Sequence, residues 1–271
     1  MLICDSQVHA PPVPGHTGVN GIEGAPLLDE MARADVDRAI VVPITNTAAD
    51  DENSQSIDLA HRHPDRFRVM GLVRVAGASP LDDERLRALQ DRPEVLGIRI
   101  SCYREPNRSL LERDHLDWLW AAAERLNIAV MILASGNLDK VARLADRHPE
   151  LRVVVDHLGL DPFAVFTDEA SFLNALEPLL PLARRSNIAV KASGLPNAVD
   201  ESWPFPTTHQ PVRRVLDAFG PTRTFWGSDL TRLTCTYREC VAHFTDGLPF
   251  LEGAALELVM GRAICDWLHW A

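Results

Sequence analysis

The amino-acid sequence predicts an α/β fold, namely a (β/α)8 barrel (TIM barrel) that forms a single domain over residues 1–271. Two observations predict it: eight short apolar runs rich in Val and Ile recur along the chain, and segments with helical periodicity separate them. The length agrees, because 271 residues is close to the roughly 250 typical of such a barrel. A content of 46% hydrophobic and 24% charged residues is typical of a globular protein with a packed core.

The expected strands are short and mostly apolar. Four of them lack the alternation of polar and apolar residues, as expected for parallel strands that are covered on both faces. In chain order the runs are LIC at 2–4, AIVV at 39–42, FRVMGLV at 67–73, VLGIRI at 95–100, IAVMIL at 128–133, LRVVV at 151–155, IAVKAS at 188–193 and TFWGS at 224–228.

The expected helices lie between these runs and place apolar residues at i, i+3 and i+4. The clearest are PLLDEMARADV at 26–36, NSQSIDLAHRH at 53–63, LDWLWAAAERL at 116–126, LDKVARLADRH at 138–148 and VRRVLDAFG at 212–220. Regular alternation of strand and helix is the pattern of βα units with right-handed crossovers, and eight such units can close into a barrel. An open doubly wound sheet is the alternative architecture, although no G-x-G-x-x-G motif follows the first strand.

The charge and the cysteines exclude several classes of partner. The 27 Lys and Arg residues and 38 Asp and Glu residues give a formal charge of -11, which repels nucleic acids and anionic membranes. Five cysteines without a C-x-x-C pair predict neither a disulfide framework nor a thiolate zinc site. The N-terminus lacks a signal-peptide pattern, and no apolar stretch is long enough to span a membrane. We therefore expect a cytoplasmic protein with no nucleic-acid or membrane partner.

Three of the apolar runs end in polar residues, at the end of the barrel where active sites lie. These endings are Asp5-Ser6-Gln7-Val8-His9, Asp156-His157-Leu158-Gly159 and Gly227-Ser228-Asp229. Because side chains alternate along a strand, we expect Asp5, Gln7 and His9 to share the face toward the barrel axis. Burying these groups together costs free energy unless they satisfy one another or bind a ligand. A hydrogen-bonded network that only closes the barrel is the alternative interpretation.

Three cations lie in or at the end of otherwise apolar runs, namely Arg74, Arg99 and Lys191. Cations are rarely buried without partners. On a chain of charge -11, three cations near one barrel mouth would form a local anion site for a carboxylate-bearing substrate. The alternative is that each cation pairs with a core acid such as Asp5 or Asp156.

The three polar strand ends, with Trp226 directly before the last of them, resemble those of the amidohydrolase superfamily of metal-dependent hydrolases. The resemblance is nearest to the amidohydrolase-2 branch, which includes 2-pyrone-4,6-dicarboxylate lactonase, related sugar lactonases and aryl decarboxylases. It covers nearly the whole chain and extends to Met260-Gly261-Arg262-Ala263, where the family commonly has a Gly-x-Asn-Ala turn before its last helix. The resemblance implies a hydrolase with a (β/α)8 barrel.

The sequence departs from this family in the residues that bind metal. Strand one of the family usually reads D-x-H-x-H with both imidazoles on a divalent ion, whereas the first imidazole is replaced here by Gln7. Strand five usually supplies another histidine, but none is present in ILAS at 132–135. An amide oxygen is a weak substitute ligand for zinc. We expect either no metal or one weakly bound divalent ion, Zn or Mn, on His9, His157 and Asp229.

The leading hypothesis is hydrolysis of a lactone or similar activated ester that carries a carboxylate. Asp229 would be the general base for water, while His157 and His9 would orient that water or stabilise the oxyanion. The substrate would be bound by Gln7, Arg74, Arg99 and Lys191. An activated ester suits a site without a metal hydroxide, because it is cleaved more easily than an amide.

Two other functions are alternatives. One is decarboxylation of an aromatic or unsaturated acid with a single divalent ion, and the other is a barrel that binds an acidic ligand without catalysis.

Barrels of this family often pair, so a homodimer is one expected assembly. The proline-rich segments 11–15 and 203–211 follow strands one and seven and are expected to be loops that shape specificity. Isolated histidines in helical segments, among them His115, His243 and His269, are expected at the surface.

Overall fold

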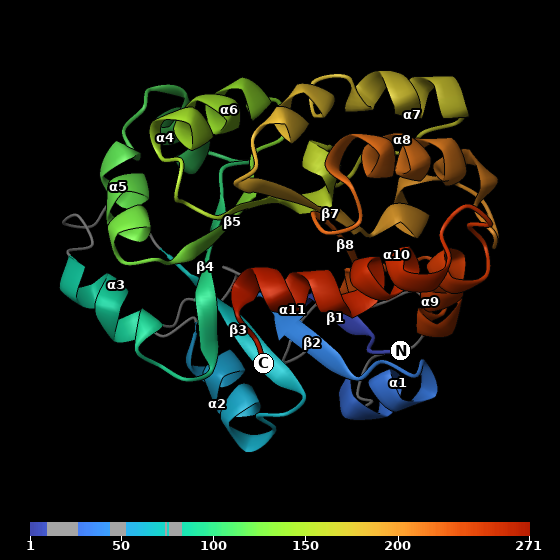
Figure 1. The fold of residues 1–271 in the computed structure, drawn as a ribbon, viewed down its shortest axis with the longest axis horizontal. Coiled ribbons are helices and arrows are strands. Elements are labelled where there is room, and N and C mark those ends of the chain that lie inside the picture. Colours follow the sequence, from blue (N-terminus) through green and yellow to red (C-terminus); the bar gives the residue numbers. More distant parts are fainter. Residues whose placement is uncertain (10–26, 44–52, 74, 76–82) are drawn as a thin grey trace.

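The computed structural model describes residues 1–9, 27–43, 53–73, 75 and 83–271. Eight parallel strands lie side by side in chain order and curve into a nearly closed barrel, which confirms the predicted fold (Figure 1). The strands are β1 (Cys4–Val8), β2 (Arg38–Val41), β3 (Phe67–Leu72), β4 (Val95–Ser101), β5 (Ala129–Leu133), β6 (Val153–Val155), β7 (Ile188–Ser193) and β8 (Thr224–Gly227).

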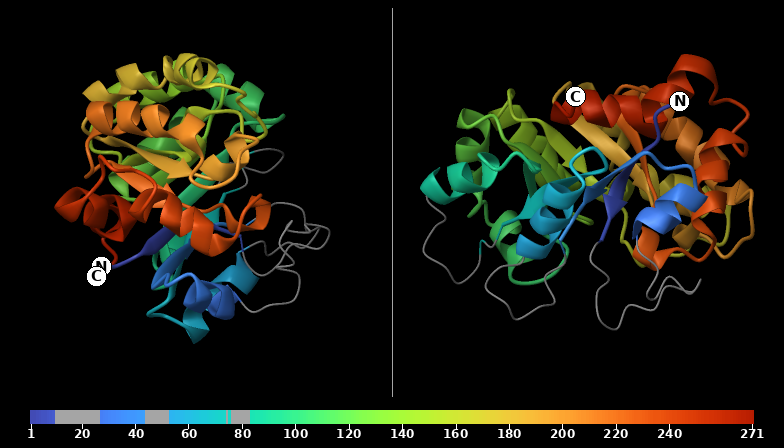
Figure 2. Two further views of the ribbon diagram at one scale, coloured as in Figure 1. Left: turned by 90° about the vertical axis from the view of Figure 1, so that its right-hand side faces the viewer. Right: turned by 90° about the horizontal axis from the view of Figure 1, so that it is seen from below.

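Helices surround the barrel on its outer side (Figures 1 and 2). Each of the five helices expected from apolar periodicity is present. The helices are α1 (Leu27–Arg33), α2 (Ser54–Arg62), α3 (Asp83–Gln90), α4 (Asn107–Glu112), α5 (Asp117–Arg125), α6 (Leu138–Arg147), α7 (Glu169–Leu176), α8 (His209–Phe219), α9 (Tyr237–Thr245), α10 (Gly253–Glu257) and α11 (Ala263–Leu268). The loop expected at 203–211 contains a 3-10 turn and the first residues of α8, and the segment 11–15 lies outside the described residues.

The core has two parts, because strand side chains alternate between the inside and the outside of the barrel. On β5, Val130 and Ile132 pack in the cluster that lies between strands and helices. Met131 belongs instead to the cluster inside the barrel, together with Ile264 and Leu268 of α11. Helix α11 therefore closes the N-terminal end of the barrel with apolar side chains, which leaves polar chemistry to the opposite end.

Gly261 allows this closure. A Cβ atom at Gly261 would lie 2.7 Å from both the backbone nitrogen of Cys4 and the carbonyl oxygen of Leu2. Real Cβ atoms do not approach backbone so closely, so a side chain here would push the final helices away from β1. The motif that resembles the family's last turn thus lies against the first strand of the barrel.

Strand β1 differs from the prediction in a way that changes which side chains face the site. It begins at Cys4 and contains Asp5 and Gln7, and its register with β2 shifts between Asp5 and Val8. Such a bulge interrupts the alternation of side chains. Asp5 consequently contacts Tyr237 of the outer helix α9, whereas Gln7 and His9 contact each other. The prediction that Asp5, Gln7 and His9 share one face is therefore wrong for Asp5, because it assumed a regular pleat.

The prediction that His243 lies at the surface is also wrong. His243 is fully buried on α9, where its ring packs at right angles against Phe205. The hydroxyl of Thr208 donates to the Phe205 carbonyl at 2.7 Å, so it accepts from His243 Nε2 at 2.6 Å. Burial lowers the pKa of His243 to about 3. The imidazole is therefore neutral in the folded protein at neutral pH.

We predict that this histidine makes the fold sensitive to acid. The unfolded chain protonates His243 near its ordinary pKa of about 6.5, whereas the folded chain does so only near 3. Unfolding is therefore favoured progressively as the pH falls through this window, by about 1.4 kcal/mol per pH unit. His243→Gln keeps an N–H donor for Thr208 and should lose stability less steeply in urea titrations between pH 6 and 4. The exposed control His115→Gln should follow the wild type, and parallel loss in His243→Gln would contradict the prediction.

No helix among the described residues is long and apolar enough to cross a membrane. The assignment of residues 1–271 to one domain, the homodimer and the cytoplasmic location remain predictions.

Candidate active site

Two candidate catalytic residues follow their strands in a strained backbone conformation. His157 directly follows Asp156 at the end of β6 and has a φ of 50°, and Asp229 follows β8 with a φ of 53°. Side chains other than glycine are uncommon in this left-handed region, which costs about 1–3 kcal/mol and recurs at functional sites. The strain is compatible with a function for both side chains.

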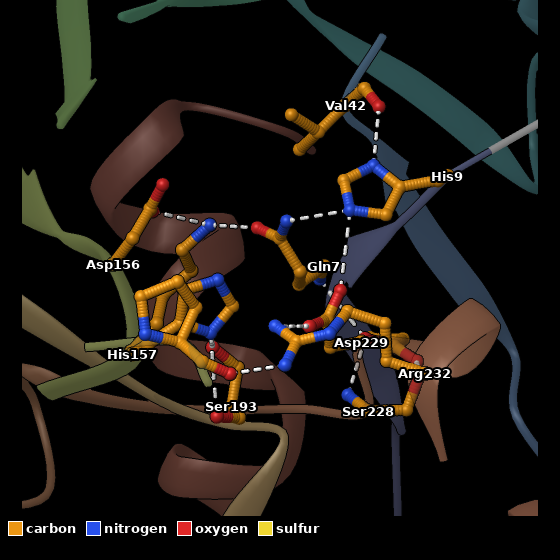
Figure 3. A network of polar contacts seen from close by, with 12 residues as sticks. Gln7, His9, Val42, Asp156, His157, Ser193, Ser228, Asp229 and Arg232 are labelled. Atoms are coloured by element: carbon orange, nitrogen blue, oxygen red, sulfur yellow. Dashed lines mark hydrogen bonds and ion pairs between the residues drawn. The ribbon is translucent and has the colours of Figure 1, made fainter. Parts of the chain in front are cut away.

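His9 and Asp229 lie against each other beyond the ends of β1 and β8 (Figure 3). His9 Nδ1 lies 2.8 Å from the carbonyl oxygen of Val42, and His9 Nε2 lies 3.3 Å from Gln7 Nε2. The same Nε2 atom lies 3.2 Å from Asp229 Oδ1. Asp229 Oδ2 is 3.2 Å from Arg232 Nη1, whereas the buried Oδ1 has no hydrogen-bond donor among the described residues. One carboxylate oxygen is therefore free to accept a proton.

Asp229 carries a negative charge. Burial acts to raise its pKa, but neighbouring groups, Arg232 among them, outweigh burial and lower the pKa below its usual range. Asp229 is therefore ionised at neutral pH.

His157 is oriented by strand β7. Its Nδ1 atom lies 2.9 Å from Ser193 Oγ and 3.4 Å from the Ser193 carbonyl oxygen. Burial lowers the pKa of His157 from its usual value. Since Ser193 occupies Nδ1, Nε2 is the ring nitrogen that a ligand can reach.

Arg232 is a candidate site residue that the sequence analysis missed. It lies three residues after Asp229, pairs with that carboxylate, and donates from Nη2 to the carbonyl oxygen of Pro162. Its guanidinium lies 4.6 Å from the centre of the Phe163 ring. The i,i+3 spacing from Asp229 is a signal in the sequence, but the contacts with Pro162 and Phe163 come from the loop after β6.

The predicted cations pair with one buried acid. Asp156 is bound by Lys191 at 2.7 Å and by Arg99 at 3.0 Å, and Asp5 pairs with neither of them. Burial acts to raise the pKa of Asp156, but these two cations lower it below its usual range. Only the Nε–H of Arg99 has a partner among the described residues. Arg74 lies outside the part of the chain that the structure describes.

Asp5 joins the first and last strands of the barrel. Its carboxylate accepts hydrogen bonds of 2.9 Å from the backbone N–H groups of Gln7 and Ser228, and it also accepts from the Ser228 hydroxyl. The Tyr237 hydroxyl donates at 2.7 Å. Burial nevertheless raises the pKa of Asp5. With four donors around it, this side chain has a structural function.

We predict that Tyr237→Phe lowers the free energy of unfolding by about 1–3 kcal/mol, because it removes one donor from a buried carboxylate. The matched control is Tyr103→Phe, which removes a hydroxyl that donates to Asp161 at the surface, at 3.0 Å. Urea unfolding at pH 7 measures both changes. Equal, small losses in the two variants would show that the contact between Tyr237 and Asp5 contributes little.

The described residues do not fit a tightly bound metal ion. They contain no group of three His, Cys, Asp or Glu side chains that could hold one. His9 Nε2 and Asp229 Oδ1 are close together, but Gln7 turns its amide nitrogen toward His9. His157 does not complete a set with them. A facial site needs three such ligands, so we derive no catalytic step through a metal.

A small hollow opens beside these residues. Its lining includes His157, Asp161, Ser193, Gly194, Asp229 and Arg232. The cavity places the ionised Asp229 and the reachable side of His157 on one surface.

The fold and this arrangement at the strand ends define an amidohydrolase-like barrel. The chain belongs to the Amidohydro_2 family of amidohydrolases, whose family model matches residues 5–270. It is therefore an enzyme of the hydrolase type.

Individual relatives have low sequence identity to this chain. L-fucono-1,5-lactonase of Burkholderia ambifaria is 29% identical over 203 residues, which cover 73% of this chain, and the chain spans only 66% of the length of that relative. An amidohydrolase structure from Burkholderia multivorans with bound zinc has a TM-score of 0.80 at 21% identity and covers 99% of both chains. A probable 2-pyrone-4,6-dicarboxylic acid hydrolase from Acinetobacter baumannii, with citric acid bound, has a TM-score of 0.68 at 15% identity over 100% of both chains. At these identities the two structures show a shared fold.

Proposed function

We propose that the chain hydrolyses a small lactone or similar activated ester that carries a carboxylate, with Asp229 as the general base. The observation that carries this proposal is the buried, ionised carboxylate of Asp229, whose Oδ1 atom lacks a donor and lies 3.2 Å from His9 Nε2. The similarity to a lactonase supports lactone hydrolysis as the reaction type.

The unpartnered oxygen of Asp229 suits one water molecule. A water that donates a hydrogen to Asp229 Oδ1 satisfies this atom, whereas His9 Nε2 already faces the amide nitrogen of Gln7. As the water oxygen attacks the lactone carbonyl, Asp229 takes up its proton. The ring C–O bond then breaks, and the proton passes to the departing alkoxide. His157 and Arg232 at the cavity surface would stabilise the oxyanion formed in between.

The group around Asp156 supplies the positive charge for a substrate carboxylate. The two cations and one carboxylate of this group sum to a formal charge of +1. Arg99 has N–H donors beyond the one bound to Asp156, and its side chain is 11% exposed, whereas that of Lys191 is 0% exposed. We therefore assign the recognition of the substrate carboxylate to Arg99.

We predict that Asp229→Asn lowers kcat on a panel of carboxylated lactones by about 100-fold or more, because the amide cannot accept the proton of water. The matched control is Asp161→Asn, which changes another acid of the same cavity that accepts from Tyr103. Chromatographic analysis of products identifies the hydroxy acid. Full activity of Asp229→Asn, or no hydrolysis of any lactone by the wild type, would overturn the proposal, and release of CO2 would indicate a decarboxylase instead.

We predict that Arg99→Gln removes the preference for a charged substrate. Asp156 keeps Lys191 as its partner in this variant, so the fold should survive. The ratio of kcat/KM for a carboxylated lactone to that for its methyl ester should fall by about tenfold or more, since a charged hydrogen bond is lost. An unchanged ratio would assign carboxylate recognition to another group.

A further inference from the structure

Lys191 is a buried cation whose donors are all occupied. Its ammonium group has three N–H bonds. It meets three acceptors: Asp156 Oδ1 at 2.7 Å, Met131 Sδ at 3.4 Å and Gln7 Oε1. The side chain is 0% exposed. Lys191 therefore has no donor left for a substrate, and its place in the site must be explained by what it does to its neighbours.

The ammonium group determines how the Gln7 amide is turned. An ammonium can only donate, so the amide atom that faces Lys191 must be the oxygen. The amide nitrogen of Gln7 then faces His9 Nε2 at 3.3 Å (Figure 3). Because an amide NH2 group can only donate, His9 Nε2 accepts in this contact, whereas Asp229 Oδ1 at 3.2 Å has no hydrogen-bond partner in the described part of the chain.

The contact made by the other ring nitrogen of His9, Nδ1, requires the same protonation state. A carbonyl oxygen can only accept, so His9 Nδ1 must carry the hydrogen that bonds to Val42 at 2.8 Å. Both contacts are satisfied by the neutral ring with its hydrogen on Nδ1. The Nε2 lone pair then accepts from Gln7, and Asp229 Oδ1, which lies 3.2 Å from Nε2, receives no hydrogen from the ring.

We propose that Lys191 and Gln7 are positioning residues: the buried ammonium group turns the Gln7 amide, and this amide keeps His9 as the Nδ1–H tautomer, which gives no hydrogen to Asp229 and leaves Asp229 Oδ1 free to act on water. Without the ammonium, the Gln7 amide is free to rotate and present its oxygen to His9. A ring that carries its hydrogen on Nε2 would then donate to Gln7 or to Asp229 Oδ1, which lies 3.2 Å away. A hydrogen bond to Asp229 would occupy the oxygen that takes up the proton of the attacking water. The effect on rate rests on the proposed function, whereas the effect on the tautomer does not.

Gln7→Glu tests this directly. The glutamate keeps an oxygen for Lys191 and has nearly the same shape, but it has no N–H for His9. Side-chain 15N NMR of the protein, labelled at histidine, reports which ring nitrogen carries hydrogen, and His9→Gln assigns the signal. We expect hydrogen on Nδ1 alone in the wild type and hydrogen on Nε2 in Gln7→Glu. We also expect kcat on lactones to fall roughly 10- to 100-fold with little change in KM.

Gln55→Glu, the same change at an exposed position of α2, is the matched control and should leave the spectrum and kcat unchanged. Lys191→Met is a second variant that keeps the length of the side chain, and it should shift the His9 tautomer in the same direction as Gln7→Glu. Hydrogen on Nε2 in the wild type would overturn the proposal, as would an unchanged tautomer or an unchanged kcat in Gln7→Glu. Because the NMR result needs no substrate, it tests the tautomer even where the lactone panel shows no hydrolysis.

Discussion

The polar interior of this barrel depends on the buried carboxylate of Asp156. Two cations, Lys191 and Arg99, enter the barrel from β7 and β4, and neither could be buried there without an acid between them. From Asp156 the contacts continue through Lys191 to Gln7 and then to His9, so strands β6, β7 and β1 are linked through side chains. Replacing Asp156 with a neutral residue would leave two charges uncompensated and remove the support for His9.

The two ends of the barrel have opposite chemistry, and the fold keeps them apart. Apolar residues of α11 and the close approach of Gly261 to β1 fill the N-terminal end. At the other end, the bulge in β1 directs Asp5 outward to bind β8 and α9, and it leaves Gln7 and His9 to the interior. The bulge in β1 thus allows Asp5 to bind β8 and α9, and it determines which side chains of β1 face the site.

Much of the fold and of the candidate site could be predicted from the sequence, because strands, helices and polar strand ends are local patterns. The polar strand ends single out His157 and Asp229 as candidates in this way. The outward turn of Asp5 could not be predicted, since it follows from the pairing of β1 with distant strands. The burial of His243 depends on Thr208 and Phe205, and the position of Arg232 depends on the loop after β6. Gln7 was recognised as unusual, but its orientation requires the position of Lys191.

The central claim is that Asp229 activates water for attack on a lactone whose carboxylate is bound by Arg99. A crystal structure of the Asp229→Asn protein with an unhydrolysed carboxylated lactone tests it most directly. The account predicts the substrate carboxylate on the guanidinium of Arg99, and the lactone carbonyl carbon about 3–3.5 Å from a water that contacts residue 229. A lactone whose carboxylate lies away from Arg99, or whose carbonyl lies far from residue 229, would contradict it.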